Sequence, residues 1–492
     1  MRKILLLLSF VSFYSISQTE YIAYPATGKG VASTFVTDYH CLGINPANLG
    51  WQQYPNKAVT MGSSEFGFSI HSQALEKQDL RDNIWSALSN KSLDSLTYDQ
   101  KVEAAQGFAD DFQFNYDYNM FGFSYQNPKF GGIAFSIRSR ATWSSSFSAD
   151  FSNLLFQGKF YEYFDSLCYD TGTDTVLIAN YGEMRPDSAQ NVVAGQASIP
   201  LNTSELINGT YLRLSLNREY HLGYGRRLFG VDSTFEVFAG VGARYIQGIA
   251  MMDLYSDDDG FRMYSAFSPG FDLNYGAAAM NNPSAMAGSV QNFFRSSVGE
   301  GWGFDAGVNV TLFNKLHLAA SVTNIGQMTY HGNVYEAVDT AVVKFSSPGM
   351  QDVNVTNAIG ELIEENGLLK LTGAESRTIK LPGTFRMGGS LELGNFAHLG
   401  VEAVAPFNNV PGSIDGFAWG IGGDIILLKR RMYLMTGLTG GGGYDFQMPV
   451  GVNFVLGGGA YEFGIASRDA ITFFTQNKPT ISTAMGFARV RF

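Results

Sequence analysis

Cysteine is scarce in this chain of 492 residues, which contains only Cys41 and Cys168. Two thiols exclude a disulfide scaffold and a multi-cysteine metal site. One bridge between them and two free thiols are both compatible with the sequence. The chain also lacks a Gly-x-Ser-x-Gly motif to accompany its 6 histidines, which argues against a serine hydrolase. We therefore expect a protein that is not an enzyme, with no catalytic residue, no metal ligand and no cofactor.

Charge is low as well. Charged residues make up 16% of the chain, whereas soluble domains usually have about 25%. The formal net charge of −11 argues against nucleic acid as a partner, because neutralising phosphates requires a basic surface. Low charge combined with 56 glycines and 14% aromatic residues is typical of a surface that faces lipid.

Long apolar runs are missing beyond the N-terminus. No uninterrupted stretch reaches the roughly 18 residues that a transmembrane helix needs. A chain without such helices can cross a membrane only as a closed barrel, because every backbone polar group in lipid must be hydrogen-bonded.

The N-terminus has the pattern of an export signal. Arg2 and Lys3 precede a mostly apolar stretch over residues 4–13 that is too short to span a bilayer. We interpret residues 1–17 as a secretory signal peptide, with cleavage near Ser17.

Apolar and polar residues alternate along most of the mature chain. Phe304, Ala306, Val308, Val310 and Leu312 are separated by Asp305, Gly307, Asn309 and Thr311. This period of two is typical of a strand with one face toward lipid and the other toward a lumen. A soluble sandwich also alternates, but fewer charges would then occupy the polar face in strand after strand.

Fourteen blocks of this kind can be counted. They cover residues 58–72, 112–126, 131–146, 211–228, 234–251, 302–312, 315–324, 383–394, 397–406, 416–428, 431–438, 449–457, 460–468 and 480–492. An even number suits a bacterial single-chain barrel. The sequence thus predicts an all-β fold, a transmembrane antiparallel up-and-down β-barrel of about 14 strands over residues 57–492. Long, partly helical loops are expected at residues 75–111, 147–206, 252–300 and 328–380.

The polar face of these strands carries charges that we expect to point into the lumen. They are Arg138, Arg140, Arg244, Asp305, Arg386, Glu392, Glu402, Arg489 and Arg491. Isolated charges in a dry interior cost several kcal/mol each. Two arrangements meet that constraint, namely an electrostatic ladder that holds a plug and an open hydrated pore.

Short motifs resemble a known superfamily of outer-membrane barrels. Gly43-Ile44-Asn45-Pro46-Ala47-Asn48-Leu49-Gly50 resembles the N-terminal segment of FadL-like barrels, in which an Asn-Pro-Ala element belongs to a plug. The stretches at residues 303–307, 322–326 and 381–388 are similar to the Bacteroidetes branch, which includes the PorV-type proteins of type IX secretion and many uncharacterised members. The resemblance implies that residues 18–56 form a plug that turns at Asn45, Pro46 and Ala47.

The same resemblance implies a function. A FadL-like barrel in the outer membrane would allow small apolar or amphipathic solutes to pass without an energy source. The alternative is a PorV-like scaffold that docks proteins of a secretion or envelope-assembly complex. Outer-membrane lipid is the expected partner in both cases, together with hydrophobic solutes in the first and envelope proteins in the second.

We expect the protein to fractionate with the outer membrane and to migrate faster on a gel before heating than after heating, as folded barrels do. Membrane fractionation and heat-modifiable gel migration check this expectation. Recovery as a soluble periplasmic protein would contradict the barrel.

Overall fold

The computed structural model describes residues 23–72, 98–109, 111–182, 186–231, 234–258, 260–286, 296–350, 360, 363, 368–410, 412–442, 444–471, 474 and 480–492. The expected signal peptide and most of the first expected loop at residues 75–111 lie outside these ranges. No helix in the described part is long and apolar enough to cross a membrane.

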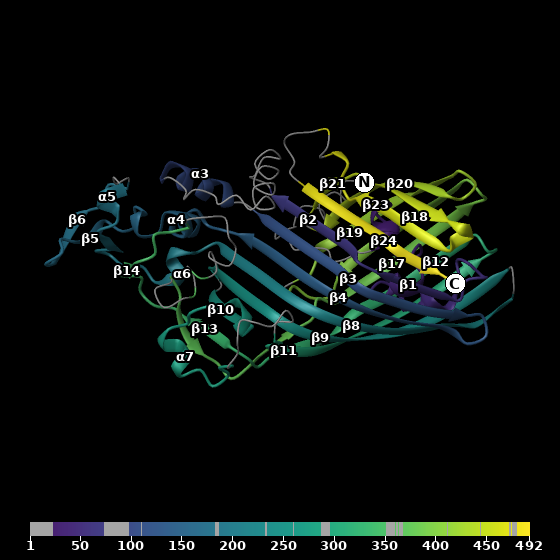
Figure 1. The fold of residues 1–492 in the computed structure, drawn as a ribbon, viewed down its shortest axis with the longest axis horizontal. Coiled ribbons are helices and arrows are strands. Elements are labelled where there is room, and N and C mark those ends of the chain that lie inside the picture. The colour runs from purple at the N-terminus through teal and green to yellow at the C-terminus, as the bar shows by residue number, and fades with distance from the viewer. Residues whose placement is uncertain are drawn as a thin grey trace, which may run out of the picture.

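The described strands form a closed antiparallel barrel with 14 strand positions (Figure 1). The first position is shared by β1 (Val59–Ser63) and β2 (Glu65–Ser72). The others are β3 (Phe112–Asn127), β4 (Gly131–Ser146), β8 (Thr210–Val231), β9 (Phe235–Asp257), β11 (Gly299–Leu312), β12 (Leu316–Tyr330), β17 (Thr384–Leu393), β18 (Ala397–Pro406), β19 (Asp415–Leu427), β20 (Met432–Gly442), β22 (Val450–Leu456), β23 (Tyr461–Ser467) and β24 (Thr480–Arg491). The ring closes because β24 pairs with β23 on one side and with β1 and β2 on the other. The predicted fold class is confirmed, and each predicted block coincides with one strand position.

Short turns gather at one end of the barrel and long connections at the other (Figure 1). The turn between β11 and β12 is built by Phe313 and Asn314, whose φ angles of 52° and 53° are left-handed. Together with Lys315 they form a three-residue connection, and two consecutive left-handed residues give a turn whose twist matches that of the flanking strands. The C-terminus lies at the short-turn end, and the long loops extend from the opposite end.

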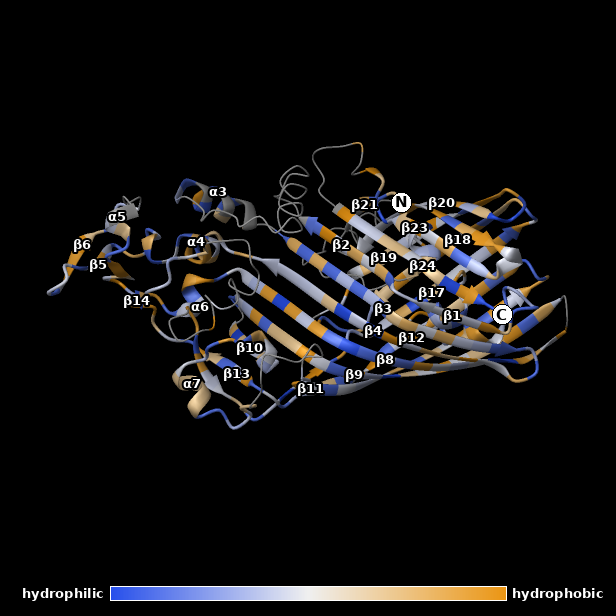
Figure 2. Ribbon diagram, in the orientation of Figure 1, coloured by the Kyte–Doolittle hydropathy of each residue, from blue (hydrophilic) through white to orange (hydrophobic). Residues whose placement is uncertain are grey.

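Hydrophobic and hydrophilic residues alternate along the strands of the barrel (Figure 2), and the exposure of their side chains places the apolar ones outside and the polar ones inside. On β11, Phe304 and Val308 are 56% and 46% exposed, while Asp305 and Asn309, the residues that directly follow them, are 6% and 0% exposed. Because the side-chain period is two, a shift by one residue would exchange the two faces. The apolar side chains therefore fix the register of each strand against lipid.

Aromatic side chains border the outer apolar band near the long loops. The rings of Tyr220 and Tyr245 lie 6.2 Å apart, and those of Tyr245 and Trp302 lie 5.2 Å apart. On β9 the apolar band runs from Phe235 to Tyr245, which is about 33 Å along the strand and roughly 25 Å across a bilayer at the usual tilt. The next outward residue, Gln247, is polar, so the rest of β9 projects beyond the band.

The projecting ends of β8 and β9 carry an extramembrane layer with its own core. Beside the barrel, β5 (Ser166–Asp170), β6 (Thr175–Ala179), β7 (Val192–Gln196) and β14 (Lys344–Phe345) form a second sheet. The other elements there are α3 (Tyr98–Phe108), α4 (Ala149–Gln157), η3 (Gly158–Phe160), α5 (Pro186–Ala189), α6 (Thr203–Leu206), β10 (Gly260–Phe267), η4 (Pro269–Phe271), α7 (Ala277–Met280), β13 (Val334–Val338), β15 (Lys370–Gly373) and β16 (Arg377–Lys380). The short segments β21 (Tyr444–Gln447) and η5 (Gly457–Gly459) complete the part of the barrel that the model describes.

Two of the segments expected as long loops contribute to this layer. Residues 147–206 look like a polar surface loop, yet Phe151, Phe156 and Phe164 are at most 1% exposed and pack with Leu212 and Met252. These apolar residues follow no simple period, so their core is not visible as a pattern. Within the loop expected at residues 328–380, β15 pairs with β13 and thereby satisfies its backbone.

An arginine placed on the lipid face tests the orientation of the strands. Val308 lies halfway between the aromatic border at Trp302 and the short turn, so Val308→Arg should lower the free energy of unfolding by about 2–4 kcal/mol. Gln247→Arg, at the edge of the band, should cost at most about 1 kcal/mol. Denaturant unfolding in phospholipid vesicles measures both. Equal effects of the two variants would contradict the assigned band.

Candidate functional site

Residues 23–50 lie inside the barrel, and we call them the inner segment. They comprise α1 (Tyr24–Thr27), η1 (Asp38–Cys41) and η2 (Pro46–Gly50). Glycines on the inner face of the wall allow a close approach. A Cβ atom on Gly422 or on Gly437 would lie 1.9 Å or 2.2 Å from the carbonyl oxygen of Lys29. Backbone thus packs directly on backbone over β19 and β20.

The Asn-Pro-Ala turn anchors the inner segment to β11. The side-chain oxygen of Asn45 accepts a hydrogen bond from the backbone N–H of Ala47 at 3.1 Å, which caps η2. The side-chain amide of Asn45 donates to the carbonyl of Val308 at 3.2 Å. Pro46 then supplies the fixed φ that suits the first helical position. All three turn residues are buried, and Asn45 and Ala47 are 0% exposed.

A second asparagine, Asn48, joins the segment to itself and to the wall. Its amide donates to the carbonyls of Ser33 and Val36, both at 2.8 Å. Its side-chain oxygen accepts from Asn309 of β11 at 2.8 Å. Sequence reasoning did not single out Asn48, although its place in the same motif as Asn45 was a usable signal.

The last strand binds the inner segment through charge. Asp38 of η1 forms ion pairs with Arg489 and with Arg491, the latter at 3.6 Å. Glu462 of β23 pairs with the same two guanidinium groups, at 3.2 Å from Arg489. All four side chains are at most 5% exposed. Two positive and two negative charges thus neutralise each other within one buried cluster.

Two further carboxylates of the wall bind the inner segment near its start. Asp424 of β19 lies 2.5 Å from the ammonium group of Lys29 and 2.8 Å from the ring of His398. Glu402 of β18 accepts a hydrogen bond from the backbone N–H of Ala32 at 2.5 Å and another from the hydroxyl of Ser33.

Glu402 also forms an ion pair within the wall itself. Arg386 of β17 lies 3.1 Å from Glu402. The backbone N–H of Ala32 and the hydroxyl of Ser33 therefore share a carboxylate that is already neutralised, which lowers the cost of burying it.

The opposite wall has a network of its own. Arg140 lies 3.3 Å from Glu219, and Arg244 lies 3.6 Å from Glu219 and 3.0 Å from Asp305. His221 completes the group, with its ring 2.8 Å from Glu219. The backbone carbonyl of Ile44 accepts a hydrogen bond from Ser321 at 2.6 Å near this network.

Two of the charges expected in the lumen behave differently. Glu392 is partly exposed, and its carboxylate lies 3.7 Å from the ring of His317. Arg138 is 7% exposed but forms no ion pair within the described part of the chain. The other seven expected residues all belong to buried ion-paired groups.

Sequence reasoning did not identify Lys29, Asp38 and Glu65 as residues that take part in the polar contacts inside the lumen. Glu65 opens β2 and is fully buried, where it accepts hydrogen bonds from Tyr39 at 2.7 Å and from Asn119 at 2.7 Å. Lys29 and Asp38 lie in a segment without periodicity, so no alternation could show where they point.

The structure offers no centre for metal chemistry in the residues it describes. No group of three or more histidine, cysteine, aspartate or glutamate side chains there is arranged to hold a metal ion. Cys41 and Cys168 are both buried free thiols, so the bridge that the sequence left open does not form.

Removing one buried carboxylate tests the importance of the charged cluster. Glu462→Gln leaves Arg489 and Arg491 with Asp38 alone, so we expect a loss of about 3–5 kcal/mol in the free energy of unfolding. Glu236→Gln is the matched control, because its pair with Arg227 is solvent-accessible and worth at most about 1 kcal/mol. Denaturant unfolding in vesicles compares them, and a similar small effect of both would contradict a dry, cooperative cluster.

Comparisons with known proteins give the following likenesses. A model described as "Family of unknown function (DUF5723)" matches residues 182–412. No curated protein matches the chain. Among solved structures, the Pseudomonas putida toluene transporter TodX is 9% identical, with a TM-score of 0.40, and the alignment covers 98% of each chain.

Two other solved structures are similar to the same degree. The Ralstonia pickettii toluene transporter TbuX is 10% identical at a TM-score of 0.43, over 96% of this chain and 99% of that one. A Pseudomonas aeruginosa FadL homologue is 10% identical at a TM-score of 0.38, over 98% and 97% of the two chains. The evidence for the barrel is the register of its own strands, and it does not depend on these likenesses.

Proposed function

We propose that the protein is a plugged outer-membrane barrel through which small apolar or amphipathic solutes pass without an energy source. In this proposal the inner segment is the gate. The observation that carries it is the fit of residues 23–50 inside the barrel, held by contacts that can break and re-form. These contacts are the pairs of Lys29 with Asp424 and of Asp38 with Arg489, and the hydrogen bonds to Glu402.

The outer face supports residence in a membrane. Large apolar side chains such as Val241, Phe417 and Ile421 are 61%, 59% and 53% exposed. Contiguous apolar surface of this kind is unfavourable in water and favourable against hydrocarbon. The expected signal peptide and the likeness to the Bacteroidetes branch of FadL-like barrels belong to the same proposal.

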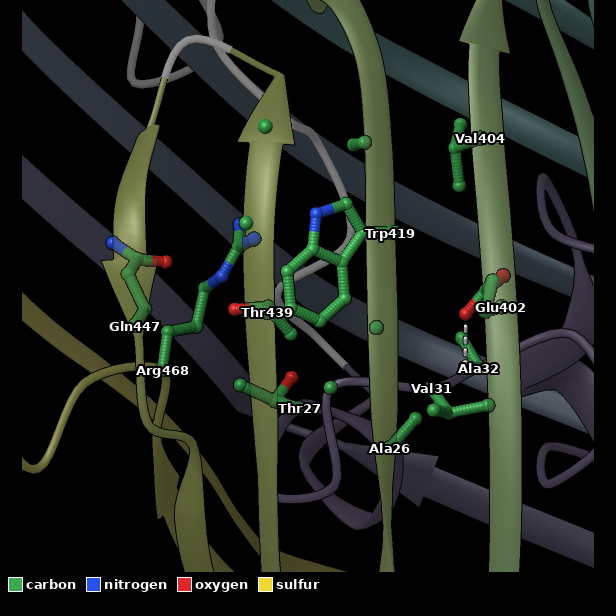
Figure 3. Close-up of a pocket in the computed structure, with 15 residues that line it drawn as sticks. Ala26, Thr27, Val31, Ala32, Glu402, Val404, Trp419, Thr439, Gln447 and Arg468 are labelled. Carbon is green, nitrogen blue, oxygen red and sulfur yellow. Dashed lines mark hydrogen bonds between the residues drawn. The ribbon is translucent and has the colours of Figure 1, made fainter. Parts of the chain in front are cut away.

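Cavities on two sides of the inner segment support a gating role. One lies between Ala26–Ala32 and strands β18, β19 and β20, and its lining includes Thr439 and Arg468 (Figure 3). The other is lined by Lys29, Trp51, His317 and Asp424. Because the segment separates these cavities, a displacement of the segment would connect them.

The inner face near the long loops supports apolar solutes. Here the wall is lined by Ile246, Met251, Met328 and Tyr330, which are at most 2% exposed and pack with Leu381. An apolar solute that enters from the loop end would therefore have to displace this packing, and would then be surrounded by apolar side chains before it reaches the charged middle of the lumen.

A scaffold role is the alternative, and the outer sheet favours it. Leu177 and Val193 of that sheet are 58% and 50% exposed, and nearby Tyr181 and Ile199 are 90% and 82% exposed. In the part of the chain that the structure describes, β6 pairs only with β5, so its other edge is free. Such an edge can accept a strand of an envelope protein.

A reversible cross-link distinguishes the two roles. A Cβ atom on Gly388 would lie 3.2 Å from the Cβ atom of Ser33, close to the separation of a disulfide. Ser33→Cys and Gly388→Cys, in a chain whose Cys41 and Cys168 are alanine, should lock the segment to β17. We expect the oxidised lock to reduce uptake of a small aromatic hydrocarbon into vesicles, and a reductant to restore it.

The single variant Ser33→Cys is the control for the substitution itself. Equal uptake by the oxidised and reduced double variants would contradict the gate. If, in addition, envelope proteins co-purify with the parent and are lost on Leu177→Asp, the scaffold role is favoured instead.

A further inference from the structure

A cavity on the loop side of the inner segment has an unusual set of charges. Leu42 and Ile44 form one side of it, and Pro382 and Ile414 lie opposite. Its charged lining side chains are Arg138, Arg140, Arg244 and Arg386, joined by the ring of His40. Among the described residues no carboxylate belongs to the lining, although many carboxylates occupy the same lumen.

The carboxylates that neutralise three of these arginines stand away from the cavity. Glu219, Asp305 and Glu402 pair with Arg140, Arg244 and Arg386, yet none of the three lines the space. The three arginines therefore border the cavity, while the carboxylates that pair with them do not. A charge that enters the cavity meets the positive groups first.

Arg138 has no such partner. Its side chain lines the cavity, is 7% exposed and forms no hydrogen bond or ion pair within the described residues. The Nε atom of Arg138 is buried without any acceptor. Asp117 and Glu219 act on it only beyond ion-pair distance. An unpaired buried guanidinium is costly, because burial removes its hydration without replacing it.

We propose that this cavity binds an oxyanion, of the carboxylate or phosphate type, with Arg138 as its main ligand. Guanidinium groups bind such anions through two parallel hydrogen bonds, which suits both chemistries. The cavity has space for about two or three water molecules, which matches one anionic group. Thr323, Asn324 and Thr384 add polar lining.

The inference deepens the proposed function and rests on it for the access of solutes to the lumen. It narrows the class of proposed solutes from amphipathic molecules in general to those that carry an anionic group. Binding is measurable on the purified barrel without transport, so a failed gating experiment and a failed binding experiment are separate results.

Calorimetric titration of the full chain in an uncharged detergent tests the site. The probes are inorganic phosphate, octyl phosphate and octanol. We expect octyl phosphate to bind and octanol to bind at least about tenfold more weakly, because a hydrogen bond to a charged group contributes about 1.5–3 kcal/mol. Arg138→Gln should weaken octyl phosphate binding about tenfold for the same reason, and Arg138→Lys should retain part of it.

Arg213→Gln is the matched control, because Arg213 is a buried inward arginine that pairs with Asp253 outside the cavity. It should bind as the parent does. Binding of inorganic phosphate as well would identify a free oxyanion as sufficient, whereas binding of octyl phosphate alone would identify the headgroup of an amphiphile. Absence of binding by both phosphates, or an Arg138→Gln variant that is heat-modifiable and binds like the parent, would overturn the proposal.

Discussion

The buried ion pairs between the inner segment and the last strand are the interaction on which the rest of the lumen depends. The wall alone places two guanidinium groups, Arg489 and Arg491, against the single carboxylate of Glu462. Asp38 supplies the second negative charge. Because an unpaired buried charge costs several kcal/mol, the wall is electrostatically complete only when the segment is in place.

The same charges restrict the register of the barrel. Arg489 and Arg491 occupy inward positions of β24, which closes the ring against β1. A shift by one residue would turn both toward the edge of the lipid, where an arginine costs at most about 1 kcal/mol, and would also break their ion pairs with Asp38 and Glu462. Lipid on the outside and the inner segment on the inside therefore select the same register.

The sequence predicts those parts of the molecule in which a period repeats. All 14 strand positions follow from alternation, and the inward placement of residues such as Arg386 and Glu402 follows with them. The partners that these charges have within the inner segment do not follow from alternation. Asp38 and Arg489 are 451 residues apart in the chain, and no local pattern relates them. The extramembrane core around Phe151 and Phe164 is similarly hidden, because its residues come from several irregular segments.

Cys41 provides the most direct measurement of the central claim, that the inner segment packs inside the barrel. It lies in η1 and is 0% exposed. With Cys168 replaced by alanine, a water-soluble maleimide should leave Cys41 unmodified in the folded protein and modify it once heat has unfolded the barrel. Modification of the folded protein at the rate of the unfolded one would contradict the account.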